Sequence, residues 1–261
     1  LSLNGLEQID ESVAKALAQW QGDILSKLSL NGLQQIDESV AIALVQWQGG
    51  ILSLNGLQQI DESVAIALSQ WKGNNLSLDG LQQLDEAVAI ALSQWKGDEL
   101  FLNGLLQIDE SIAKALAQWQ GAHLYLDGVQ QLNEATAKAL SQLKGTTGLS
   151  LDGVQQLDEA TAKALSQFQG DYLSLKGLKQ IDRIIAKILS EFKVFKGKDL
   201  RLEGLQQIDE VTAKALSQFQ GDNLSLDGLQ QIDEAIAKAL SQFQGDNLSL
   251  DGLQQIDEAV A

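Results

Sequence analysis

The sequence predicts an α/β solenoid of about 11 turns, each turn being one copy of a repeated unit of about 24 residues. Leu, Ala, Gln, Ser, Asp and Gly recur in the same order, which indicates a duplicated unit. Each unit joins a short alternating segment to a segment with helical spacing. The units begin at Leu1, Leu28, Leu52, Leu76, Leu100, Leu124, Leu149, Leu173, Leu200, Leu224 and Leu248, and the last is truncated.

The repeats cover the whole chain, so we predict a single solenoid domain over residues 1–261. The chain contains no Met and stops partway through a repeat, and we therefore expect it to be a segment of a longer chain. Small insertions interrupt the spacing around Asp23 to Lys27, near Gly148 and around Val194 to Lys196. They fall between helix and strand, where loops tolerate extra residues.

The tenth unit shows what the first part of each repeat is for. Leu224 and Leu226 alternate with Ser225, which predicts a short strand with both leucines on one side. Asp227-Gly228 predicts a turn, and the apolar residues after the turn are expected to point into the core. One unit is too small to bury this apolar face alone, so we expect neighbouring strands to align into a parallel sheet.

The second part of the unit predicts an amphipathic helix. Asp233 suits the N-cap, and the apolar residues that follow recur at three- and four-residue spacings as far as about Gln244. The paired Asp-Glu at equivalent positions, through Asp257-Glu258, is interpreted as helix capping. Gly245 is expected to end the helix in a left-handed conformation, as are its equivalents from Gly22 onward.

The pattern L-x-L-x-G-L-x-x-I, as in LSLNGLQQI at Leu52 to Ile60, resembles the leucine-rich repeat and covers essentially the whole chain. It is most similar to bacterial variants such as those of the BspA-like kind. The resemblance implies a right-handed solenoid with its parallel sheet on the concave face and its helices on the convex face. It also implies use as a protein-interaction scaffold.

The sequence departs from the family at the usual ladder Asn, near whose place Leu or Val stands, which leaves the detailed class and curvature open. A Gln column is predicted to form the ladder instead, because an amide both donates and accepts hydrogen bonds. The alternative is a solvated turn residue. The column comprises Gln8, Gln35, Gln59, Gln83, Gln107, Gln131, Gln156, Gln180, Gln207, Gln231 and Gln255.

Composition argues against catalysis and against several classes of ligand. One histidine and no cysteine give neither a hydrolase triad of the usual kind nor a metal cluster, so we expect no enzyme and no cofactor. A formal charge of −17 opposes nucleic acid and anionic headgroups unless the charge is locally reversed, and we expect no such reversal. No apolar run reaches the ~20 residues of a membrane helix. The composition is compatible with a cytoplasmic and with a cell-surface location.

Acidic residues after the strand raise one alternative, a calcium site. Such a site would use carboxylates of neighbouring turns, and a solvated acidic face is the competing interpretation. The residues at this position are Asp79, Asp127, Asp152, Asp227 and Asp251.

Departures from the repeat consensus mark candidate binding residues on the strand face. The outward strand position, Ser in eight repeats, becomes Phe101, Tyr125 and Arg201 in the other three. Exposed aromatic and Arg side chains commonly anchor recognition, whereas drift on a solvated face is the alternative. The candidate partner-binding residues are Phe101, His123, Tyr125, Tyr172, Lys176 and Arg201.

A second departure lies on the helices. An exposed Lys of the consensus is replaced by Ile42, Ile66 and Ile90 in three consecutive repeats, which predicts an apolar stripe for lateral packing, or isoleucines partly shielded by their neighbours. The eighth repeat is also irregular over Arg183 to Ile188, which we interpret as local repacking.

Together these patterns favour a non-catalytic protein-interaction scaffold, with a protein or a second copy as partner. The alternative is a structural subunit of a self-assembling filament or cell-surface array, because solenoids normally need capping repeats and none is recognisable here.

Overall fold

The computed structural model describes residues 1–192 and 198–256. Contacts group the chain into two compact units, which we call unit 1 (residues 1–128 and 143–146) and unit 2 (residues 129–142 and 147–261). The predicted insertion at Val194 to Lys196 and the predicted cap at Asp257 lie outside the described residues. The single domain over 1–261 stays a prediction.

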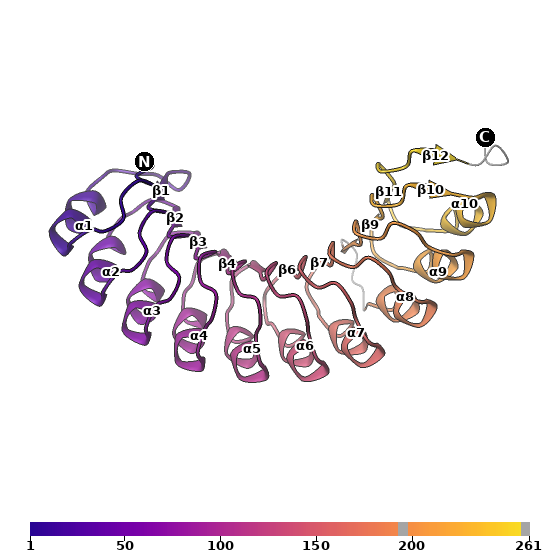
Figure 1. The fold of residues 1–261 in the computed structure, drawn as a ribbon, viewed down its shortest axis with the longest axis horizontal. Coiled ribbons are helices and arrows are strands. Elements are labelled where there is room, and N and C mark those ends of the chain that lie inside the picture. The colour runs from indigo at the N-terminus through magenta and orange to yellow at the C-terminus, as the bar shows by residue number, and fades with distance from the viewer. Residues whose placement is uncertain (193–197, 257–261) are drawn as a thin grey trace. The chain divides into compact units, whose positions relative to one another are not determined.

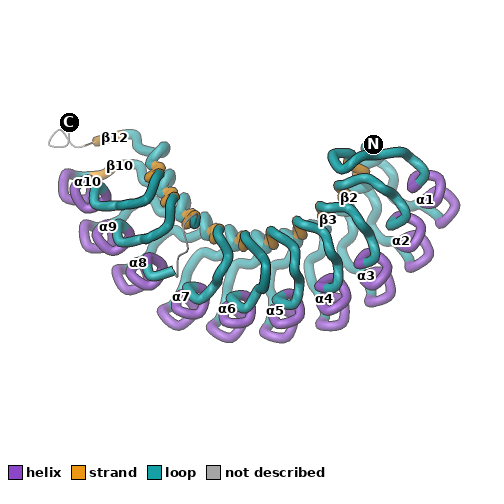
Figure 2. Tube along the Cα trace, turned by 180° about the vertical axis from the view of Figure 1, so that it is seen from behind, coloured by secondary structure: helices purple, strands orange, loops and turns teal. Residues whose placement is uncertain are grey.

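Unit 1 alternates helices and strands along the chain. Its strands are parallel neighbours in chain order, and Figures 1 and 2 show them along one side of the unit with the helices along the other. Its elements are α1 (Glu11–Ala18), β1 (Lys27–Ser29), α2 (Glu38–Leu44), β2 (Ile51–Ser53), α3 (Glu62–Ser69), β3 (Asn75–Ser77), α4 (Glu86–Ser93), β4 (Glu99–Phe101), α5 (Glu110–Leu116) and β5 (His123–Tyr125).

Unit 2 repeats this arrangement. Its parallel strands run in the order β6-β7-β8-β9-β11, and a separate short pair joins β10 to β12. Its elements are α6 (Glu134–Leu140), β6 (Gly148–Ser150), α7 (Glu159–Leu165), β7 (Tyr172–Ser174), α8 (Arg183–Ser190), β8 (Asp199–Arg201), α9 (Glu210–Leu216), β9 (Asn223–Ser225), β10 (Gln231–Ile232), α10 (Glu234–Leu240), β11 (Asn247–Ser249) and β12 (Gln255–Ile256).

The strand leucines form the core of each unit in strict register. Leu52 pairs with Leu28 and Leu76 in unit 1, and Leu200 pairs with Leu173 and Leu224 in unit 2. All six are completely buried. The regular alternation of one parallel strand and one helix per repeat confirms the predicted leucine-rich-repeat solenoid.

A column of aromatic rings fills the core beside the helices, and the sequence analysis did not single it out. In unit 1, Trp47, Trp71, Trp95 and Trp119 are buried and stack at centroid separations of 6.0 to 6.2 Å, with planes within 9° of parallel. The indole Nε1 of Trp95 donates to the carbonyl of Trp71 at 3.0 Å. Rings in this column therefore link successive repeats by stacking and by hydrogen bonds.

The helices begin where predicted and end earlier. An aspartate precedes each described helix except α6, where Asn133 takes the same role, and the cap oxygen accepts a hydrogen bond from the N–H three residues on. In α10 the helix stops at Leu240, not at Gln244. The Phe243 N–H bonds to Leu240 at 3.0 Å, so the chain tightens after Leu240.

The glycine after each helix serves a purpose different from the predicted left-handed cap. Among the described residues, Gly145 alone has a positive φ, of 77°. At Gly97 an added Cβ would lie 2.0 Å from Cζ2 of Trp95. The prediction of left-handed caps is therefore wrong at the described glycines of this column other than Gly145, and Gly197 lies outside the described residues. Glycine at a position such as 97 makes room for the ring of the aromatic column.

The structure places a hydrogen-bonded ladder at a column of residues that follows the strands and is Asn or Asp except at Lys176 and Glu203. Asn31 Oδ1 accepts from Ser53 Oγ at 2.8 Å and from the Asn55 N–H at 3.0 Å, both in the next repeat. In unit 2, Asp227 Oδ1 accepts from the Asp251 N–H at 3.0 Å. A ladder residue is thus present, three residues after the central leucine of the strand.

The Gln column predicted to form this ladder lies at the surface. Gln59, Gln83 and the equivalent glutamines are exposed. Within residues 1–192 and 198–256, these side chains are not joined to one another by hydrogen bonds. Their exposure favours the solvated alternative, and the ladder at Gln35, Gln59, Gln83, Gln107, Gln131 and Gln156 stays a prediction without support from this geometry.

Candidate functional site

The candidate site is the exposed face of the strands, where the outward residues of successive repeats stand side by side. In β4 the middle residue, Leu100, is buried, while Glu99 and Phe101 on either side are half-exposed. The alternation follows from strand geometry, because neighbouring side chains point to opposite faces. The consensus Ser at this outward position makes Phe101 a local exception.

Phe101, His123 and Tyr125 form what we call the aromatic cluster of unit 1. Phe101 pairs with Tyr125 across β4 and β5, and their rings stack at 4.3 Å with planes 4° apart. His123 lies on the same side of β5, its ring centroid 6.3 Å from that of Tyr125. The sequence prediction that Phe101 and Tyr125 lie side by side is confirmed, and the three rings form a half-exposed apolar surface.

Tyr172, Lys176 and Arg201 belong to unit 2, and we call them the cationic cluster. The guanidinium of Arg201 lies 4.8 Å from the ring centroid of Tyr172, in a cation–π contact. Lys176 Nζ lies 3.0 Å from Glu203 Oε2. Burial acts to lower the pKa of Lys176, and the hydrogen bond and charge of Glu203 outweigh it and raise that pKa. Glu203 therefore holds Lys176 charged and partly neutralises it.

The six predicted partner-binding residues are thus divided between two compact units, three in each. Their local geometry is defined within each unit. Whether they contact a partner stays a prediction.

The acidic column considered for calcium takes part in the ladder described above. Burial acts to raise the pKa of Asp227, but hydrogen bonds from Ser249, from the Asp251 N–H and from Ser225 hold it below its usual value. Among residues 1–192 and 198–256 no group of three or more His, Cys, Asp or Glu residues is arranged to hold a metal ion. Calcium binding stays an untested hypothesis.

The isoleucine stripe lies on the opposite, helical side of unit 1. Ile42, Ile66 and Ile90 are 49%, 49% and 48% exposed, one on each of α2, α3 and α4. These three helices pack against one another in order. An apolar residue that is half in water on three successive helices is the arrangement that lateral packing requires.

A basic region that spans the eighth repeat and the start of the ninth was not predicted from the sequence. Residues 176–201 carry eight basic residues against Asp182, Glu191 and Asp199, a formal net charge of +5. The expectation that the charge is nowhere reversed is therefore wrong, and the signal was present in the sequence. The basic residues are Lys176, Lys179, Arg183, Lys187, Lys193, Lys196, Lys198 and Arg201.

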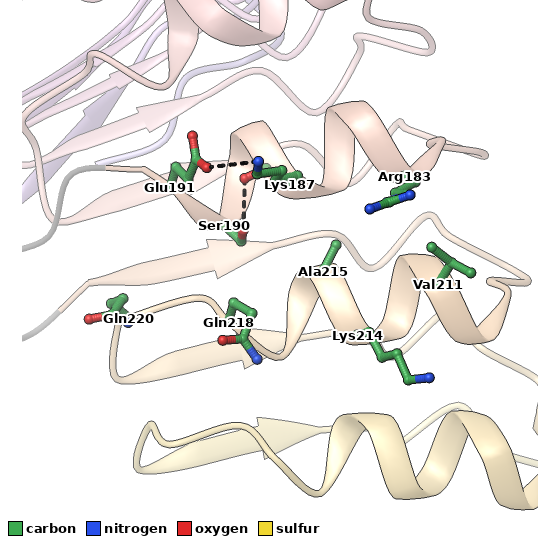
Figure 3. A pocket seen from close by; sticks show the side chains of 9 residues that line it. All are labelled: Arg183, Lys187, Ser190, Glu191, Val211, Lys214, Ala215, Gln218 and Gln220. Atoms are coloured by element: carbon green, nitrogen blue, oxygen red, sulfur yellow. Dashed lines mark hydrogen bonds and ion pairs between the residues drawn. The ribbon is translucent and has the colours of Figure 1, made fainter.

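A groove of about 470 Å³ lies between α8, which belongs to this region, and α9, which follows it. Figure 3 shows its lining, with Arg183 and Lys187 on α8 and Val211, Lys214 and Ala215 on α9. Arg183 also lines a neighbouring hollow of about 640 Å³ at the N-terminal ends of the same two helices. The groove combines an apolar wall with a cationic rim.

Comparison with known proteins gives distant structural likenesses. No family model and no curated protein matches the sequence. Among solved structures, an internalin from Listeria monocytogenes is similar at 18% identity, with a TM-score of 0.48 over 86% of this chain and 71% of that chain. A Toll–Spätzle complex from Drosophila is similar at 12% identity, with a TM-score of 0.44 over 87% of this chain and 39% of that chain. The fold assignment rests on the strand register and buried leucines.

None of the described helices is both long enough and apolar enough to cross a membrane.

Proposed function

We propose that this chain is a non-catalytic scaffold that binds a partner protein on the exposed strand face, with the aromatic cluster as its anchor. The carrying observation is the stack of Phe101 on Tyr125, half-exposed at positions where most repeats have Ser. Large aromatic side chains supply much contact area at little entropic cost. Tyr172 and Arg201 offer a second contact of mixed aromatic and cationic character.

The test replaces the anchor by the residue that other repeats use. Phe101→Ser with Tyr125→Ser restores the consensus and should leave the fold intact, while partner affinity falls roughly 30-fold, as for a hot spot of about 2 kcal/mol. Proteins captured from a lysate by the unaltered chain are purified and their affinities measured for both chains. A variant altered on the helical side, Ile66→Lys, is the matched control. Equal affinity of the strand-face variant would reject the aromatic cluster as the anchor.

The second candidate function is a self-associating structural subunit. The observation that favours it is the isoleucine stripe, half-exposed on three consecutive helices. Sedimentation velocity separates the two functions, because a scaffold for foreign partners stays monomeric on its own at all concentrations.

A further inference from the structure

A surface ion pair between the consensus Glu and Lys forms in α1, α5 and α9, and α2–α4 lack its lysine. Glu11 and Lys15 of α1 approach to 2.5 Å, one helical turn apart, and α5 and α9 have the same pair. In α2, α3 and α4 the Lys position holds the isoleucine stripe, while the glutamates remain as Glu38, Glu62 and Glu86. In the described part of the chain these glutamates have no ion-pair partner. The α2–α4 face therefore combines three apolar side chains with the unpaired negative charge of these three glutamates.

Helix α8 also lacks this ion pair, but there the glutamate is replaced and the lysine is kept. Arg183 occupies the position of the glutamate, so the first turn of α8 has no acid. Lys187 keeps its place one turn later, 3.8 Å from the exposed Glu191, and Ile184 beside Arg183 is 51% exposed. The outer face of α8 is therefore apolar and cationic, complementary to that of α2–α4.

The groove between α8 and α9 shows how the two complementary faces can fit together. Val211, 43% exposed, and Ala215 form an apolar wall on α9, and Arg183 and Lys187 stand on the opposite side (Figure 3). An isoleucine with a glutamate one turn before it presents the matching pattern, because the apolar group can enter between the walls while the carboxylate reaches the cationic rim.

We infer that the α2–α4 face of one copy docks on the α8–α9 groove of a second copy. A second copy is favoured over a foreign partner because one chain carries both halves, matched in charge and in apolar content. The two surfaces are different, so the contact is heterologous and each added copy leaves one surface of each kind free. This inference gives the self-association candidate a defined interface, independent of the strand face.

The experiment is sedimentation velocity on the full chain over a concentration series. The unaltered chain is expected to form species larger than dimers as concentration rises. The stripe variant Ile42→Lys, Ile66→Lys, Ile90→Lys and the groove variant Arg183→Glu, Lys187→Glu are each expected to weaken self-association at least roughly tenfold. The isoleucine and Arg183 replacements restore consensus residues, and circular dichroism checks that both variants fold. If the triple stripe variant fails to fold, Ile66→Lys alone replaces it.

Mixing the two variants supplies the decisive outcome. The stripe variant keeps an intact groove and the groove variant keeps an intact stripe, so an equimolar mixture should form a one-to-one dimer and nothing larger. The Phe101→Ser, Tyr125→Ser chain should self-associate like the unaltered chain, which separates this inference from strand-face binding. A chain that is monomeric at all concentrations, or a mixture that stays monomeric, overturns the inference.

Discussion

Replacing Trp95 by Phe is expected to destabilise the protein more than replacing Trp47 by Phe. Both indoles are buried to within 1% and each stacks on the ring of Trp71 at about the same distance, 6.0 and 6.1 Å. They differ in one respect. The Nε1 of Trp95 donates to the Trp71 carbonyl, whereas the buried Nε1 of Trp47 has no hydrogen-bond partner in the described part of the chain.

The magnitude follows from that difference, because the loss of ring area is common to both variants and cancels. Trp95→Phe removes a hydrogen bond worth ~1 kcal/mol and leaves the Trp71 carbonyl without this donor. Trp47→Phe removes a buried unpaired N–H, whose desolvation costs ~1–3 kcal/mol. The free energy of unfolding of Trp95→Phe should therefore lie roughly 2–4 kcal/mol below that of Trp47→Phe.

Urea denaturation followed by far-UV circular dichroism measures the comparison, with unchanged m-values as the condition for comparing midpoints. Trp71→Phe and Trp119→Phe are matched controls. Trp71 Nε1 donates to the Trp47 carbonyl at 3.2 Å, so its variant should behave like that of Trp95; the buried Nε1 of Trp119 has no partner in the described chain, so its variant should behave like that of Trp47. Trp47→Phe proving as costly as Trp95→Phe would refute the reasoning.

Three further predictions test the caps, the ladder and the close-packed glycines. Hydrogen bonds from the Val64 N–H and the Ser63 hydroxyl lower the pKa of Asp61 below 3.8. The capping contribution of Asp61 to stability is therefore complete above that pH and is lost as the pH falls through the lower pKa of the folded state. Asp61→Asn should flatten this acid dependence of the urea midpoint. Asn55→Ala should cost ~1–3 kcal/mol in the same assay, and Gln59→Ala within ~0.5 kcal/mol of zero. Gly97→Ala should lower the thermal midpoint by a clash worth ~1–3 kcal/mol.

The sequence predicted the features that follow from the repeat period and from local backbone geometry. The leucine period determined the strand register, and an aspartate before an apolar stripe located the helix starts, because both rest on local geometry. The side-by-side placement of Phe101 and Tyr125 followed directly from the register. These residues share one repeat position, so their spacing alone specified their contact.

The features that escaped prediction depend on contacts between particular atoms, which the repeat spacing alone does not give. Asn31 accepts hydrogen bonds from Ser53 and from the Asn55 N–H, both in the next repeat. The Asn55 N–H can be recognised as a partner only once the rise between turns is known. A Gln column and an Asn column look equally suited to a ladder in the sequence, since both carry amides. Gly97 likewise resembled a helix cap because its neighbour Trp95 was counted only as part of an apolar stripe.

The candidate binding residues could be identified from the sequence, but their division into two clusters could not. Exceptions to the Ser consensus identified Phe101 and Arg201, whereas only coordinates separate the aromatic cluster from the cationic cluster. The groove between α8 and α9 required two helices to be placed together, although the basic run over residues 176–201 was readable from the start.

The aromatic column also makes tryptophan fluorescence specific to unit 1. All five tryptophans of the chain lie in unit 1, whereas the equivalent positions of the described part of unit 2 hold phenylalanine. Near-parallel indoles about 6 Å apart exchange excitation readily, so light absorbed by any one of them reports on the column as a whole. Tryptophan emission is therefore a built-in probe of one half of the chain, and its melting curve, laid over that of the total helix signal, shows whether the two halves unfold together.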